Sequence, residues 1–355
     1  MTALQRFWSW TLARHLVVAL LGVGAVILIT DQVSDYRNTQ LTTLGAYICV
    51  TAGLTLLTGT NGQISLGHAA LMAVGGYTVA LILQDFSDNN ITGQWMLPVA
   101  LLAGTVVTTL AGVVVGMAAA RLRGPYLAGA TLAFGVALPS ITSQFTSIFK
   151  GDQGIGLLFD GPPASLGSSF SFSHWQAWYS LFAAVIVLFF LANVQRSAVG
   201  RHLRAVRDDE IAASLAGLPA ARLRVLAFAV SSAAAGLGGG VFAVGLQTAS
   251  PGSFSLTLSL SLLTAVVIGG LGSLTGAVLG SIVLIYLEDV IPGFVDRLHL
   301  SSASAQKLHD NLPPAVYGAL LIGVMMLLPG GITSLVRPVV VRVTRRTTPS
   351  TGGNR

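Results

Sequence analysis

The sequence predicts an all-α, polytopic membrane protein with about ten transmembrane helices. Hydrophobic residues make up 53% of the chain and charged residues only 9%, whereas a soluble domain carries about 25% charged residues. The apolar residues also gather in runs of about 20, the length that an α-helix needs to cross a bilayer. Composition and run length therefore agree on the class of protein.

Ten such runs follow one another, and each is predicted to form a spanning helix. They cover residues 15–31, 40–58, 64–83, 96–120, 126–148, 176–194, 222–247, 254–269, 272–291 and 313–330. Residues 255–267 alternate between polar and apolar, as a strand would. Because an open strand in lipid leaves its backbone unpaired, we predict a helix with one hydroxyl-bearing side instead. The short connection 269–276 indicates a tight or re-entrant turn.

The charged residues lie between the runs and predict an orientation. If the N-terminus is cytoplasmic, 15 of 19 basic residues fall on the cytoplasmic side, and 10 of 13 acidic residues, Glu288 and Asp289 among them, fall outside. Lysine and arginine beside spans favour the cytoplasmic side. The sequence therefore predicts both termini in the cytoplasm and spans almost free of charge. The basic residues flank spans, so they do not indicate nucleic-acid binding.

The predicted cytoplasmic loop 196–224 contains a short helix of about two turns. Asp208 is predicted to cap this helix, because an aspartate side chain accepts from the first free backbone N–H groups. Asp209 and Glu210 suit the positive end of the helix dipole. Gly217 is predicted to end the helix, since glycine adopts the left-handed conformation common at that position.

An apolar face runs along this loop helix. Ile211, Leu215 and Leu218 recur at i, i+4 and i+7, and the helix is flanked by Arg201, Arg204, Arg207, Arg222 and Arg224. One interpretation is a positively charged loop with a helical kink. The other is a docking helix that presents apolar and charged side chains to a soluble partner. The residues alone do not choose between them.

A second unusual segment, "TGTNGQISLGHAALMAVGGY" at 58–77, is rich in glycine and polar residues. Gly59 and Gly62 allow a break in the helix, which is tolerated at membrane depth only where protein or a cavity covers it. With residues 64–77 taken as a helix, one side would carry Ser65, His68, Ala69, Met72, Ala73 and Gly76. Small residues on one side favour close packing against another helix.

Several polar side chains within spans are candidates for a translocation pathway. Asn61, Gln63 and His68 are costly in lipid, so we expect them to face the protein interior, hydrogen-bonded or lining a wet path. The full set of candidates is Asn61, Gln63, Ser65, His68, Tyr126, Thr131, Ser261 and Thr264. Packing is the competing explanation for each of them.

Signatures of enzymes are missing from the sequence. It has no GxxxxGK[ST] loop, HExxH motif or CxxC pair, so we expect no metal and no cofactor bound by this chain. An intramembrane enzyme would need an acidic or thiol partner for His68. An ion-coupled secondary transporter usually relies on intramembrane carboxylates, and we place no carboxylate inside a span. Both classes remain as alternatives.

Four blocks make the sequence resemble a known family. "GQISLGHAALMAVGGY", "LRGPYLAGATLAFG", "GRHLRAVRDDEIAASLAG" and "VIGGLGSLTGAVLG" are similar, in this order, to segments of LivM-type permeases of branched-chain amino acid ABC importers. "RDDEIAASLAG" also resembles the EAA-type loop with which ABC importer permeases engage their ATPase subunits. Glu210, Ala212, Ala213 and Gly217 match that pattern.

The resemblance implies a domain arrangement and partners. A transmembrane permease domain would cover 1–336, with 196–224 as its cytoplasmic coupling loop and 337–355 as a basic cytoplasmic tail, in the bacterial cytoplasmic (inner) membrane. The implied partners are a second LivH-like permease, two cytoplasmic ABC ATPases that bind ATP and Mg, an extracytoplasmic solute-binding protein and membrane lipid. The implied coupling residues are Arg204, Arg207, Asp208, Asp209, Glu210, Ala213 and Gly217.

The resemblance implies branched-chain or other small amino acids as the transported solute. Relatives in this family also carry short amides or urea. The sequence departs from the pattern at "FKGDQGIGL", where Lys150 and Asp152 occur, and at 255–264, where some relatives carry an acidic residue and this chain has none. A urea or short-amide permease therefore stays open as the alternative within the family.

Overall fold

The computed structural model describes residues 11–122, 125–167, 170–297, 302–328 and 330–334. The predicted tail 337–355 lies outside them. The long helices are α2 (Thr11–Gln32), α3 (Asp35–Thr55), α4 (His68–Asp88), α5 (Met96–Ala119), α6 (Pro125–Gln144), α8 (Phe172–Arg196), α11 (Ala220–Leu246), α12 (Leu256–Gly269), α13 (Leu274–Asp296) and α14 (Ser302–Leu327). The shorter elements are η1 (Leu56–Thr60), α7 (Thr146–Phe149), η2 (Gly151–Gln153), β1 (Ile155–Gly156), η3 (Ala164–Leu166), α9 (Ala198–Asp208), α10 (Glu210–Leu215), β2 (Thr248–Ala249) and η4 (Pro251–Phe254).

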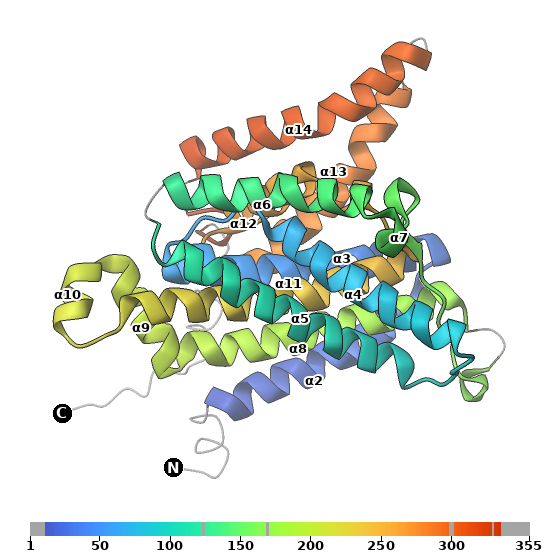
Figure 1. Cartoon of the computed structure of the whole chain (residues 1–355), viewed down its shortest axis with the longest axis horizontal. Helices are drawn as coiled ribbons and strands as arrows, with labels where there is room; N and C mark the ends of the chain where they lie inside the picture. The colour runs from blue at the N-terminus through green and yellow to red at the C-terminus, as the bar shows by residue number, and fades with distance from the viewer. Residues whose placement is uncertain (1–10, 123–124, 168–169, 298–301, 329, 335–355) are drawn as a thin grey trace, which may run out of the picture.

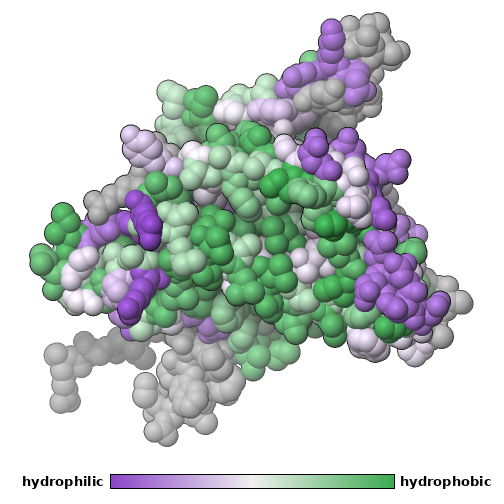
Figure 2. Space-filling model, viewed as in Figure 1, coloured by the Kyte–Doolittle hydropathy of each residue, from purple (hydrophilic) through white to green (hydrophobic). Residues whose placement is uncertain are grey.

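The long helices form a membrane-sized bundle. In the described part of the chain, ten helices are long and apolar enough to cross a membrane, and they correspond one to one with the ten predicted spans. Apolar side chains cover the middle of the face in Figure 2, and hydrophilic residues gather at its two ends. This distribution matches a polytopic all-α membrane protein, as the sequence predicts.

Helix α11 lies at the centre of the bundle and packs against α3, α4 and α5 (Figure 1). Glycines allow the close approach: a Cβ on Gly239 would overlap the backbone of Met72, and one on Gly75 would overlap the backbone of Gly236. Small residues are the usual means of bringing membrane helices together, because lipid gives no hydrophobic drive for their association. The core therefore depends on backbone contact more than on large side chains.

Both predictions for residues 254–291 are confirmed. Residues 256–269 form helix α12, capped by Ser255, whose hydroxyl accepts from the Leu258 N–H at 3.3 Å. The chain then turns within four residues into α13. Gly270 and Gly272 have φ angles of +115° and +82° in this turn, a region of backbone conformation that favours glycine.

One prediction about charge is wrong. Glu288 lies inside α13, within the candidate span Leu274–Ile291, although we expected no carboxylate inside a span. The hydroxyl of Tyr47, from α3, donates to its carboxyl oxygen at 3.1 Å. The predicted span 272–291 already includes Glu288, so the error was to count this carboxyl among the residues outside the membrane. The bundle thus contains a carboxyl among its spans.

The packing of α11 gives a stability prediction. Gly239→Val should destabilise the protein by about 1–3 kcal/mol, because its side chain would push α11 away from α4. The apparent melting temperature in detergent, followed by size-exclusion chromatography after heating, should fall by several degrees. Gly129→Val is the matched control, since no atom lies within 4 Å of a Cβ built there. Equal effects of the two variants would contradict the packing argument.

Candidate functional site

The loop between α8 and α11 forms two helices at one end of the bundle (Figure 1). Helix α9 begins after Ser197, whose hydroxyl accepts from the Gly200 N–H at 3.4 Å. Leu203 and Val206 are buried on one side of α9. Arg204 reaches back from α9 and donates to the Gln195 carbonyl at 3.0 Å. The first half of the loop is therefore fixed to the end of α8.

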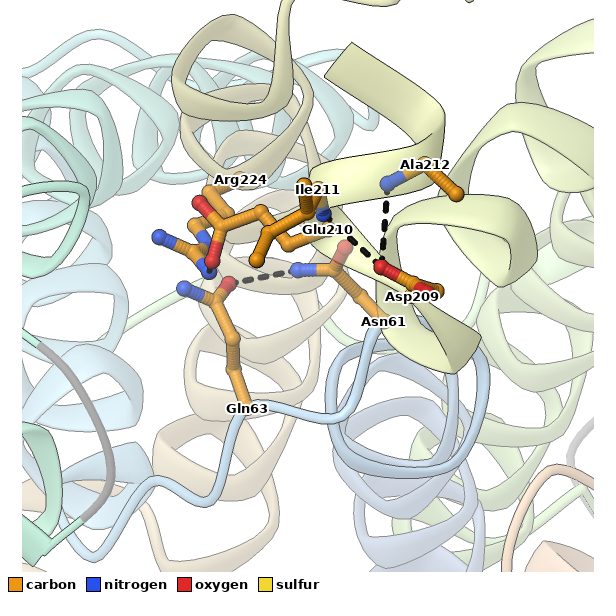
Figure 3. A network of polar contacts seen from close by, with 7 residues as sticks. All are labelled: Asn61, Gln63, Asp209, Glu210, Ile211, Ala212 and Arg224. Carbon is orange, nitrogen blue, oxygen red and sulfur yellow. Dashed lines mark hydrogen bonds and ion pairs between the residues drawn. The ribbon is translucent and has the colours of Figure 1, made fainter. Parts of the chain in front are cut away.

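Helix α10 is capped by Asp209, and not by Asp208 as the sequence predicted. One carboxyl oxygen of Asp209 accepts from the N–H groups of Ile211 at 2.9 Å and Ala212 at 3.0 Å (Figure 3). The prediction failed because α9 continues through Asp208, so the two helices separate one residue later. Asp208 instead pairs with Arg207, with nitrogen to oxygen distances of 2.7 and 2.9 Å.

The end of α10 is confirmed at Gly217. This residue has φ +83°, its N–H donates to the Ser214 carbonyl at 3.0 Å, and the Leu218 N–H donates to the Ala213 carbonyl at 3.0 Å. This pair of hydrogen bonds is the Schellman arrangement, which satisfies the last carbonyls of a helix. Both ends of the six-residue helix are thus specified by local sequence.

Glu210 connects α10 to the centre of the bundle. Its carboxyl oxygen lies 2.6 Å from a guanidinium nitrogen of Arg224, on α11, and the side chains are 28% and 15% exposed. Ala213 is buried on the same helix. A partly buried, hydrogen-bonded pair of this kind holds its geometry better than an exposed one. The pair therefore joins α10 to α11, the helix that packs against α3, α4, α5 and α8.

Two large apolar side chains of α10 remain uncovered. Ile211 is 74% exposed and Leu215 is 85% exposed, one turn apart on a helix among charged residues. Leu218, the third predicted member of the apolar face, is half-buried and packs against the core. The exposed apolar face of α10 therefore consists of Ile211 and Leu215.

Arg207 links the loop to a break in the second span. Its guanidinium donates to the Gly59 carbonyl at 2.5 Å, within the π-helix η1 that ends α3. A Cβ on Gly62 would lie 2.8 Å from Arg207 Cγ, and a Cβ on Gly59 would overlap the backbone of Gly272. The sequence placed Arg207 in the coupling loop but gave no sign of this contact, which depends on two segments far apart in the chain.

The predicted helix over 64–77 is wrong in its first turn, because α4 begins only at His68. Residues 62–67 form an irregular connection, where Gly62 has φ +75°. Non-helical backbone at this depth is tolerated where protein covers it. Here the Leu66 N–H donates to the Thr131 hydroxyl at 3.0 Å. This side chain of α6 therefore gives a hydrogen-bond partner to one backbone group in the non-helical segment.

The side chains of the break are buried and largely paired with one another. Asn61 donates to the Gln63 side-chain oxygen at 2.6 Å (Figure 3), while the Asn61 oxygen has no hydrogen-bond partner among the described residues. The two ring nitrogens of His68 lie 2.9 Å from the Ser65 hydroxyl and 2.8 Å from the Ser231 hydroxyl. The expectation that these side chains face the protein interior is confirmed. Both ring nitrogens of His68 have a hydroxyl partner, so a structural role is sufficient to explain this buried histidine.

The other pathway candidates do not form one group. Thr131 and Thr264 are buried, and the Thr264 hydroxyl donates to the Leu260 carbonyl at 2.8 Å. Ser261 is buried beside a cavity that also contacts Glu288. Tyr126 is 77% exposed on the outside of α6. The role of each in translocation stays a prediction. Within the described residues, no three His, Cys, Asp or Glu side chains could together hold a metal ion.

The ten candidate spans and the short capped helix α10 at one end of the bundle describe a polytopic membrane protein, and the comparison with known families makes it a permease. The family model described as "branched-chain amino acid transport system / permease component" matches residues 38–329. The chain belongs to this family, as the sequence resemblance indicated. No solved structure matches the chain significantly.

Curated relatives support the same assignment. The high-affinity branched-chain amino acid transport system permease protein LivM of Salmonella typhimurium is 30% identical over 315 residues, covering 82% of this chain and 68% of the relative. LivM of Escherichia coli K12 is 29% identical with the same coverage. The permease protein LivH of Salmonella typhimurium is 28% identical and covers 85% of this chain and 95% of the relative.

The two aspartates before α10 give a testable difference. Asp209→Ala removes a helix cap worth about 1 kcal/mol, so amide exchange of residues 211–215 should rise about fivefold. Asp208→Ala removes the same charge but leaves the cap, so exchange there should not change. Hydrogen exchange with mass spectrometry on the membrane protein measures both, and a larger effect at Asp208 would contradict the assignment of the cap.

Proposed function

We propose that this chain is a transmembrane subunit of an ABC importer that moves branched-chain or other small amino acids across the bacterial cytoplasmic membrane. The observation that carries this proposal is the exposed apolar face of α10, Ile211 and Leu215, on a helix tied to α11 through Glu210. Family membership supplies the class of solute, because the named relatives are branched-chain amino acid permeases. ATP hydrolysis would take place on separate subunits.

The proposed assembly contains partners that match this surface. Two cytoplasmic ABC ATPases, which hold ATP and Mg, would dock on the α10 face and on its counterpart in a second permease. Relatives named LivM and LivH both align with this chain, which supports a related, LivH-like second permease. An extracytoplasmic solute-binding protein would deliver the solute. Both termini and the 196–224 loop would then lie in the cytoplasm.

The contacts of the loop suggest how ATP would drive alternating access. An ATPase that binds α10 differently in its two states would move the Glu210–Arg224 pair, and α11 with it. Arg207 would carry the same displacement to Gly59 at the end of α3. A ligand-driven change requires such a difference in binding between states. The two contacts allow the loop to act on α11 and α3 together.

Co-purification tests the assembly. From native membranes in mild detergent, this chain should bring down a P-loop ATPase and a second permease. The double variant Ile211→Asp/Leu215→Asp should lose the ATPase, because a charge replaces each exposed apolar contact, but should keep the second permease as an internal control. Recovery of the chain alone, with no ATPase bound on reconstitution, would contradict the importer and favour an ion-coupled transporter.

The Glu210–Arg224 pair gives a second prediction. Glu210→Lys places two positive charges together and should abolish ATP-dependent amino acid uptake while leaving membrane insertion unchanged. The charge exchange Glu210→Arg/Arg224→Glu restores an ion pair and should recover part of the uptake. Uptake of radiolabelled leucine, normalised to expression, measures both. Normal uptake by Glu210→Lys would show that the pair has no role in coupling.

A further inference from the structure

The carboxyl of Glu288 faces a cavity of about 260 Å³ between α3, α11, α12, α13 and α14. Its polar lining consists of Tyr47, Ser253, Ser255, Thr257, Ser261, Glu288 and Tyr317. Apolar side chains complete the wall, among them Phe242 and Ile291. The volume falls just below the roughly 300–1,000 Å³ of pockets for drug-sized ligands, so the cavity suits a smaller solute with both polar and apolar parts.

The position of the cavity places it inside the membrane and away from the loop. Glu288 lies fourteen residues after the first residue of α13, Leu274, which corresponds to about 20 Å at 1.5 Å per residue. Leu274 follows the turn that touches Gly59, at the end of the bundle where Arg207 lies. Because the hydrocarbon core is about 30 Å thick, Glu288 lies within it, in the half opposite to α9 and α10.

A carboxyl at this depth needs a partner. Tyr47 donates its hydroxyl to both oxygens of Glu288, at 3.1 and 3.4 Å, and Tyr47 and Tyr317 are buried. The lining residues include no lysine, arginine or histidine. Ionisable residues within spans are costly, and they commonly mark solute or ion paths. The cavity therefore offers a carboxyl group without a basic side chain to pair with it.

We propose that this cavity is a solute site in the permease and that Glu288 binds the primary ammonium group of the solute. The class of solute rests on the proposed function. The Phe242 and Ile291 side would take an aliphatic side chain. Ser255, which caps the 14-residue helix α12, also lines the cavity, so the solute's carboxylate would meet serine and threonine hydroxyls at the positive end of that helix. An α-amino acid with an apolar side chain has all three complementary parts.

Cysteine protection tests the site without ATP or partner subunits. Thr257→Cys places a thiol in the cavity wall, and the full-length chain in membrane vesicles is treated with N-ethylmaleimide. Wild type is the background control, because its single Cys49 is buried. L-Leucine and 3-methylbutylamine should slow labelling, whereas 4-methylpentanoate, which lacks the ammonium group, should not. Ser253→Cys provides a second position should the first variant fail to fold.

The role of Glu288 is tested in the same assay. Adding Glu288→Gln should raise the leucine concentration for half-protection at least about tenfold, the loss expected for one charge-assisted hydrogen bond. Adding Asp289→Asn should leave the leucine concentration for half-protection unchanged. Asp289 is the matched control, because it is the neighbouring acid on α13 but accepts from Tyr36 at 2.7 Å and does not line this cavity.

Three protection results would overturn the proposal. The first is that Glu288→Gln leaves the protection by leucine unchanged. The second is that 3-methylbutylamine and 4-methylpentanoate protect the cysteine equally. The third is that sodium chloride protects and choline chloride does not, which would indicate a cation site. Failure of both cysteines to react would show a cavity closed to solutes and would also overturn it. Uptake that continues without ATPases would instead contradict the proposed function, and the labelling result would remain valid.

Discussion

The arrangement of this protein depends on one constraint: backbone N–H and C=O groups inside a bilayer must find partners within the protein. The second span breaks after Asn61, and the six residues 62–67 before His68 are not helical. Thr131 from α6 satisfies the Leu66 N–H, and Ser259 from α12 accepts from the Ala69 N–H at 3.0 Å. The break is therefore possible only where α6, α11 and α12 surround it. The contacts made at the break also fix the packing of α6, α11 and α12 against α3 and α4.

Because the break must be covered, it lies where other segments converge. Gly59 touches the α12–α13 turn at Gly272 and accepts from Arg207 of the loop. The loop is also tied to α11 by Glu210 and Arg224. A force applied to α10 thus reaches both the central helix and the least regular part of the bundle. Irregular backbone stabilised by neighbouring helices is also where transporters place their moving parts and solute sites.

Helix α3 joins the two regions on which our proposals rest. The π-helix at its end contacts Arg207, and Tyr47, twelve residues before Gly59, contacts Glu288. At 1.5 Å per residue these points are about 18 Å apart along one helix. A shift of α3 at the loop end would change the surroundings of Glu288 directly. This continuity gives a physical route by which a displacement at the loop end of the bundle could alter the proposed solute site.

The sequence by itself determined the ten spans, the turn between α12 and α13, the stop of α10 at Gly217 and the family, since these follow from local composition, spacing and motifs. It misplaced the start of α4 and the cap of α10, because helix ends depend on partners such as Thr131 and on how far α9 extends. Only the tertiary structure decided that Arg207 reaches Gly59 and that Glu288 faces a cavity with Tyr47. Both are contacts between segments more than a hundred residues apart, and hydropathy and spacing carry no information about such contacts.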